Sequence, residues 1–283
     1  MRKRIIYIPV LTALIGVNLV LLIMLVGEKQ GTSRVGTREL ARVVAMYEEA
    51  GITFRAQPSA FSGVHEELIL GSADLDSMVL DFLEGAQYSM TYIYGAKTQY
   101  NSGSAVLLAD WDRHSISYKD SGVMPEQSDM SLQPVLTEEE QLMLEAVARR
   151  FAQKWLGEDV IAVGWTRSGS TLTVSFAQIV DERIYFFNSA SVTVIREGIQ
   201  AAEISYWEAG SYGDVRETLP MDEVLYRLLQ DIRSKNQGQT DEVRTLMDGY
   251  VIDSMDGNRA VAGPTLTLIM ESGKQYRSSY CHD

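Results

Sequence analysis

The hydrophobic pattern begins with an unbroken apolar run, Ile5–Val26, that contains no ionisable side chain. As a helix these 22 residues would be about 33 Å long, enough to cross a hydrocarbon core of roughly 30 Å. Three basic residues precede the run, so the positive-inside rule places residues 1–4 in the cytoplasm and the body, after a polar tether at 27–36, outside. We expect a single-pass anchor in the cell membrane; a cleaved signal peptide is the alternative, but its apolar region would be shorter.

Two positions in the middle of this run differ from the rest. Helices in lipid associate through small residues and buried polar groups, because apolar contact alone gains little there. Gly16 and Asn18 are therefore the candidate helix–helix contacts of the anchor. The alternative, that the membrane merely tolerates one asparagine, stays open.

Beyond the tether, helical spacing of apolar residues predicts a helix after Thr37 and another after Asp74. Alternation of apolar and polar residues then predicts three strands, at 88–94, 105–110 and 114–118. We interpret residues 37–121 as a first α+β domain. The stretch 122–136 carries two prolines and no periodicity, which is typical of a linker.

A second unit follows at 137–283. Thr137 and Glu140 have the spacing of a capping box, and they open a helix whose apolar stripe is Leu144, Val147, Phe151 and Trp155. Alternation and turn residues next predict strands at 160–166, 171–179, 184–187, 190–195 and 201–207, a helix after Pro220, and strands at 245–252, 264–270 and 275–280. The expected fold is therefore α+β: a transmembrane helix and two extracytoplasmic domains, each an antiparallel sheet with packed helices.

The chain is acidic, with 38 Asp and Glu against 25 Lys and Arg and a net charge of −13. The three basic residues before the anchor do not belong to the body, which is therefore more acidic still. Such a charge argues against nucleic acid or an anionic membrane surface as a ligand. Cys281 is the only cysteine, so the fold has no intramolecular disulfide.

Few residues suggest chemistry. Cys281 and His282 resemble a thiol dyad, but neighbours in a strand point to opposite faces. Asp110 and Asp112 would share a face of an extended strand, although a solvated strand end explains them better. The segment 253–257 lacks the ligand spacing of a calcium loop, and no phosphate-loop, zinc-protease or nucleophile-elbow motif occurs. We expect no catalytic, cofactor-binding or metal-binding residue, and no enzyme.

The four tryptophans divide into two pairs. Trp155 and Trp207 are expected to fill cores, because each lies on the apolar face of its predicted element. Trp111 and Trp165 are the candidate partner surface, since exposed aromatic residues often anchor a binding partner.

Five segments carry a resemblance to a known family. They are FAQIVDERIYFFNSASVTV (Phe176–Val194), ISYW (Ile204–Trp207), VLYRLLQDI (Val224–Ile232), DGYVID (Asp248–Asp253) and AGPTLTLIMESGKQYRSSY (Ala262–Tyr280). Together they resemble the YycI branch of the YycH/YycI regulators, whereas the first domain is similar in architecture only. One departure lies at Thr265-Leu266, where the family commonly has Trp.

The resemblance implies a one-pass protein of low-GC Gram-positive bacteria that regulates an essential cell-wall-sensing histidine kinase of a two-component system. The partners it implies are that kinase and a YycH-like regulator. An envelope enzyme or a binding module for wall fragments is the alternative function. A pocket with converging titratable groups would favour the alternative, whereas a broad apolar patch on a sheet edge or helix face would favour a protein-interaction role.

Overall fold

The computed structural model describes residues 37–55, 66–123, 136–215, 218–236 and 238–281. Within them lie four helices and fourteen strands, so the α+β class is confirmed. The predicted anchor and tether, with Gly16 and Asn18, lie outside the described residues, as does most of the predicted linker. None of the helices in the described ranges is long and apolar enough to span a membrane.

The helices are α2 (Thr37–Glu49), α3 (Leu75–Phe82), α4 (Glu138–Leu156) and α5 (Met221–Asn236). The first seven strands are β1 (Ile52–Phe54), β2 (Glu66–Ser72), β3 (Ser89–Ile93), β4 (Lys97–Ser102), β5 (Ala105–Asp110), β6 (Ser115–Asp120) and β7 (Val160–Ser168). The remaining strands are β8 (Thr171–Val180), β9 (Arg183–Ile195), β10 (Gly198–Ser205), β11 (Trp207–Val215), β12 (Asp241–Asp256), β13 (Arg259–Met270) and β14 (Gln275–Ser279).

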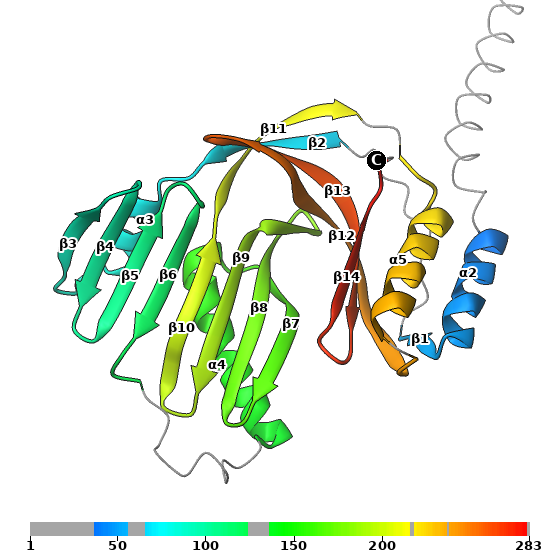
Figure 1. The fold of residues 1–283 in the computed structure, drawn as a ribbon, viewed down its shortest axis with the longest axis horizontal. Coiled ribbons are helices and arrows are strands. Elements are labelled where there is room, and N and C mark those ends of the chain that lie inside the picture. Colours follow the sequence, from blue (N-terminus) through cyan, green and yellow to red (C-terminus); the bar gives the residue numbers. More distant parts are fainter. Residues whose placement is uncertain (1–36, 56–65, 124–135, 216–217, 237, 282–283) are drawn as a thin grey trace, which may run out of the picture.

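All fourteen strands join one sheet, which is mostly antiparallel (Figure 1). Its main path of neighbours runs β11-β2-β13-β12-β9-β10-β6-β5-β4-β3. Off this path, β1 pairs with β12, β14 pairs with β13, and the β7–β8 hairpin joins β9. Among the described strands, β12 pairs in parallel with β1 and, over two residues, with β9.

The sheet has two halves, which we name after their longest helices (Figure 1). The α4 half contains β3 to β10 with α3 and α4 on one face, and its core is the largest group of buried side chains. The α5 half contains β1, β12, β13 and β14 with α2 and α5, and it has a core of its own. Strands β2 and β11 form an arch between the halves, over a third, aromatic-rich core.

These halves do not follow the predicted division at 122–136. Helix α2 belongs to the first predicted unit, yet it packs on α5 from the second, and the Tyr47 hydroxyl donates a hydrogen bond to the Leu225 carbonyl at 2.8 Å. Strand β6, also from the first unit, pairs with β10 from the second. The observed single sheet therefore differs from the two expected sheets. Alternation in a sequence shows which face of a strand is buried, but it does not show which strand lies beside it.

Helix α4 begins and ends where the sequence predicts. The Thr137 hydroxyl accepts the Glu140 backbone N–H at 3.2 Å, and a Glu140 carboxylate oxygen accepts the Thr137 N–H at 2.9 Å, which completes the capping box. Its predicted stripe is only partly right. Leu144, Phe151 and Trp155 are buried, but Val147 is 39% exposed and Ala148 takes the buried position.

The two halves meet where β9 crosses beside β12. Gly249 of β12 lies so close to β9 that an added Cβ would be 2.5 Å from the Ile184 carbonyl oxygen. Beyond this point β9 has a register shift against β8, and the buried Asn188 side chain bonds across it. Asn188 Oδ1 accepts the Trp207 N–H at 2.7 Å, and its Nδ2 donates to Gln178 Oε1 at 2.8 Å. The Asn188 side chain therefore satisfies the buried Trp207 backbone N–H beside this irregularity and is itself held by Gln178.

Candidate functional site

The two tryptophans predicted to bind a partner have different environments. Trp165, on β7, is half-buried: the Arg244 guanidinium lies 5.0 Å from its ring centroid, and the Gly273 backbone lies close to its ring. Trp111 is also half-buried, but it packs against the core of the α4 half. The structure does not bring the two side chains together on one surface element, because Trp165 belongs to β7 and Trp111 to the turn between β5 and β6.

The first candidate surface is strand β3, at the outer edge of the sheet, with Tyr88 before the strand and Tyr94 after it. We call this the β3 edge; it consists of Tyr88, Met90, Tyr92, Ile93 and Tyr94, all of which are exposed. Tyr92 is 74% exposed and Met90 46%. Its partner on the inner side is β4, and among the described strands none pairs with its outer side (Figure 1).

The β3 edge lacks the devices that usually prevent edge-to-edge pairing. Natural edge strands carry lysines, prolines or bulges, or they are covered by another element. Strand β3 has the sequence SMTYI, without a charge or a proline, and it pairs with β4 in regular register. As far as the described residues show, the outer row of β3 backbone N–H and C=O groups is unpaired, and exposed aromatic side chains flank it.

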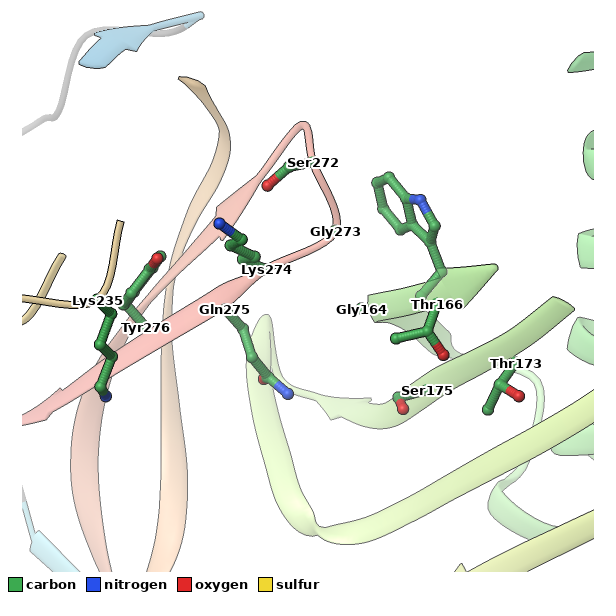
Figure 2. A pocket seen from close by; sticks show the side chains of 11 residues that line it. Gly164, Thr166, Thr173, Ser175, Lys235, Ser272, Gly273, Lys274, Gln275 and Tyr276 are labelled. Carbon is green, nitrogen blue, oxygen red and sulfur yellow. The ribbon is translucent and has the colours of Figure 1, made fainter. Parts of the chain in front are cut away.

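The second candidate surface is a groove between the two halves, which we call the inter-half groove. It consists of two adjoining cavities of about 570 and 370 Å³, which share Ser175 and Gln275 as lining residues. Figure 2 shows the larger cavity, with Ser272 to Tyr276 on one side and Thr166, Thr173 and Ser175 on the other; Trp165 also lines it. The two sides almost touch at one point, where a Cβ added to Gly164 would lie 2.9 Å from the Gly273 carbonyl oxygen.

The groove is floored by hydroxyl groups. On β8, β9 and β10 every second residue points into the core of the α4 half, so the others face away from α4. Along the open face, Ser175 pairs with Ser191, and Ser189 with Ser205. In a further row, the Thr173 and Thr193 hydroxyls lie 3.0 Å apart. We call this surface the serine–threonine face.

An ion pair borders the same face. The Asp110 carboxylate, at the end of β5, is 8% exposed and lies 2.7 Å from the Lys97 ammonium and 3.9 Å from the Arg113 guanidinium. Burial acts to raise the pKa of this carboxyl, but the Lys97 hydrogen bond, the Arg113 backbone N–H and the two positive charges outweigh it, so the pKa is lower than usual.

We therefore expect Asp110→Asn to destabilise the protein by about 1–3 kcal/mol at pH 7. A carboxyl whose pKa is depressed on folding contributes stability above its unfolded pKa, near 3.9, and loses that contribution as the pH falls through the folded pKa. The difference between wild type and variant should accordingly shrink in urea unfolding measured below about pH 4. Asp112→Asn, at an exposed turn position, is the matched control and should change little at either pH. A pH-independent loss in Asp110→Asn would contradict the ion-pair explanation.

The other residues weighed for chemistry lie apart. Strand β5 ends at Asp110, so Asp112 is in a turn and does not share a strand face with it. Cys281 is buried, whereas His282 lies outside the described residues. Apart from these candidates, the His114 ring is buried against the ring of Trp207, with the two ring centroids 3.7 Å apart. Within the described ranges, no three His, Cys, Asp or Glu side chains are grouped so that they can hold a metal ion.

Sequence reasoning missed both surfaces, although a signal for each was present. The apolar residues at 88–94 were expected to form one face of a strand, but the sequence does not tell an edge strand from a central one. The serine–threonine face was visible as Ser and Thr at alternate positions of β8 and β9. Only the pairing of these strands side by side makes the alternation into a surface.

No family model matches the sequence, and no curated protein matches it either. Among solved structures, an uncharacterized protein from Eubacterium rectale ATCC 33656 is similar at 9% identity and a TM-score of 0.44, over 81% of this chain and 87% of that one. The Bacillus megaterium YpeB C-terminal domain matches at 10% identity and a TM-score of 0.37, over 75% and 94% of the two chains. YycH from Bacillus subtilis matches at 11% identity and a TM-score of 0.40, over 86% of this chain and 61% of YycH. At these values the similarities identify neither a family nor a function.

Proposed function

We propose that the protein is a membrane-anchored regulator whose body lies outside the cytoplasm and which modulates a sensor histidine kinase through protein contacts, without catalysis. The uncharged run at 5–26, preceded by basic residues, supports the anchor and its orientation. The YycI-like segments from Phe176 onward support the class of regulator. In this proposal Gly16 and Asn18 contact the helices of the kinase, and the body pairs with a YycH-like regulator.

The observation that carries the proposal is the β3 edge. A broad apolar patch on a sheet edge was the feature that would favour a protein-interaction role over an envelope enzyme or a binding module, and the β3 edge is such a patch. The charged side chains that line the inter-half groove fit a binding module, but they lie on other strands than β3, so the two roles are compatible. The occupant we propose is an extended segment of the YycH-like regulator, added to β3 as a further strand. Its backbone would pair with the outer groups of β3, and its side chains would lie against Met90 and Tyr92.

The test is co-purification of the full chain from solubilised membranes. Tyr92→Lys should lower recovery of the YycH-like regulator at least about tenfold, because strand addition would bury part of an unpaired charge. Tyr226→Lys makes the same change on an exposed tyrosine of α5 and should leave recovery unchanged. Equal recovery with both variants would contradict the proposed edge.

A second copy of this chain is the competing occupant of the β3 edge. In that case Tyr92→Lys would change the mass of the purified full chain in light scattering, and Tyr226→Lys would not. The proposed heteromeric pairing predicts the same mass for wild type and both variants. A mass change confined to Tyr92→Lys would overturn it.

A further inference from the structure

The inter-half groove concentrates positive charge in an acidic protein. The chain has a net charge of −13, yet four cationic side chains line the groove (Arg113, Lys235, Arg277 and Lys274) against one carboxylate, that of Glu203. Among the lining side chains positive charge therefore exceeds negative charge, which favours an anion as a ligand. Lys235 and Arg113 already have carboxylate neighbours, Asp231 and Asp110 respectively.

Arg277 differs from these cations. Its guanidinium lies 4.1 Å from the ring centroid of Phe186, and its Nη2 donates to Gln275 Oε1 at 3.1 Å. Across the described part of the chain, no carboxylate lies within ion-pair distance of it. Arg277 as a whole residue is exposed on β14, and partial burial of its guanidinium lowers the pKa of that group. A fork of N–H donors in this setting is suited to a phosphate or carboxylate group.

The serine–threonine face beside Arg277 indicates which other chemical groups the ligand carries. Strands β8, β9 and β10 are paired on both sides, so their backbone groups are not available to an incoming peptide strand. The serine–threonine face offers side-chain hydroxyls, each of which can donate and accept a hydrogen bond. The hydroxyls of a sugar or other polyol can exchange hydrogen bonds with such a surface. Ser175 lines both cavities of the groove, so one such ligand could reach from one cavity into the other.

We infer that the inter-half groove binds a polyol that carries phosphate or carboxylate groups, with Arg277 at the anion and the serine–threonine face at the hydroxyls. The site is separate from the β3 edge and does not depend on the proposed pairing there. The ligand would bridge the two halves, because Arg277 belongs to β14 and Ser175 to β8.

The test is calorimetric titration of the full chain, in a neutral detergent, with four probes. These are an oligo(glycerol phosphate), an oligogalacturonate, a neutral dextran oligomer and an oligoglutamate. We expect the oligo(glycerol phosphate) or the oligogalacturonate to bind, and the dextran and the oligoglutamate to bind much more weakly. The tighter binder of the first two identifies the anionic group as phosphate or carboxylate. Arg277→Gln should weaken that binding at least about tenfold, since hydrogen bonds to charged groups are the stronger class. Arg42→Gln removes an exposed charge from α2 and should change the affinity for that probe less than about twofold.

Three further variants keep the test informative if Arg277→Gln disturbs folding. Arg277→Lys retains the charge and should bind more tightly than Arg277→Gln. Ser175→Ala removes one hydroxyl of the floor and should weaken binding about two- to tenfold. Trp165 lines the groove, so a fluorescence change on binding should disappear in Trp165→Phe. The inference would be overturned by binding that Arg277→Gln and Ser175→Ala both leave unchanged, by equal binding of the neutral dextran, or by binding of the oligoglutamate alone.

Discussion

Trp207→Ala is expected to lower the free energy of unfolding by about 3–5 kcal/mol. Trp207 is 2% exposed at the start of β11, and its buried cluster includes Leu68 and Leu70 of β2 and Tyr250 of β12. Its ring also lies against His114. Truncation would therefore leave a cavity beneath the arch, where strands from both halves meet, and the side chains around it would relax only in part.

Urea unfolding of the full chain measures this loss, and Tyr212→Ala, an exposed position on the same strand, is the control that should cost less than about 1 kcal/mol. Hydrogen exchange adds a sharper readout. Because β2 pairs with both β11 and β13, the amides of 66–72 and 259–270 should lose protection together in Trp207→Ala. Loss of amide protection in β13 alone would mean that β2 is stabilised independently of β13. That result would be expected if residues 37–121 formed a separate domain.

The sequence predicted local structure well and tertiary pairing poorly. The capping box of α4 and the Asp256-Gly257 hairpin turn are both present, since a few neighbouring residues determine them. The interleaving of the halves was not predictable in the same way. Strand β6 pairs with β10, which is about 85 residues later, and nothing in the alternation of either strand specifies the other.

The candidate surfaces show the same limit. Trp165 was predicted as a surface aromatic and lines the inter-half groove, but its neighbours, Arg244 and Gly273, come from much later in the chain. Trp111 was predicted on the same grounds and lies against a core. The rule that exposed aromatic residues bind partners does not distinguish Trp165 from Trp111. The distinction depends on which strands flank each residue.

The prediction that most directly tests the interleaved core is Phe151→Ala in α4, with an expected loss of about 3–5 kcal/mol. Phe151 is 6% exposed and meets two rings from the other side of the predicted linker. Its ring centroid lies 5.5 Å from that of Phe82 in α3 and 5.1 Å from that of Tyr118 in β6. Truncation would remove both aromatic contacts and a large apolar volume from the core of the α4 half.

Val147→Ala is the matched control on the same helix, because the sequence placed Val147 and Phe151 on one apolar stripe whereas the structure exposes Val147. We expect Val147→Ala to change the free energy of unfolding by less than about 0.5 kcal/mol. Hydrogen exchange should show that Phe151→Ala loosens α3 and β6 as well as α4, since all three share its cavity. Similar losses for the two variants, or an α3 whose protection is unaffected by Phe151→Ala, would indicate that residues 37–121 fold around a core of their own.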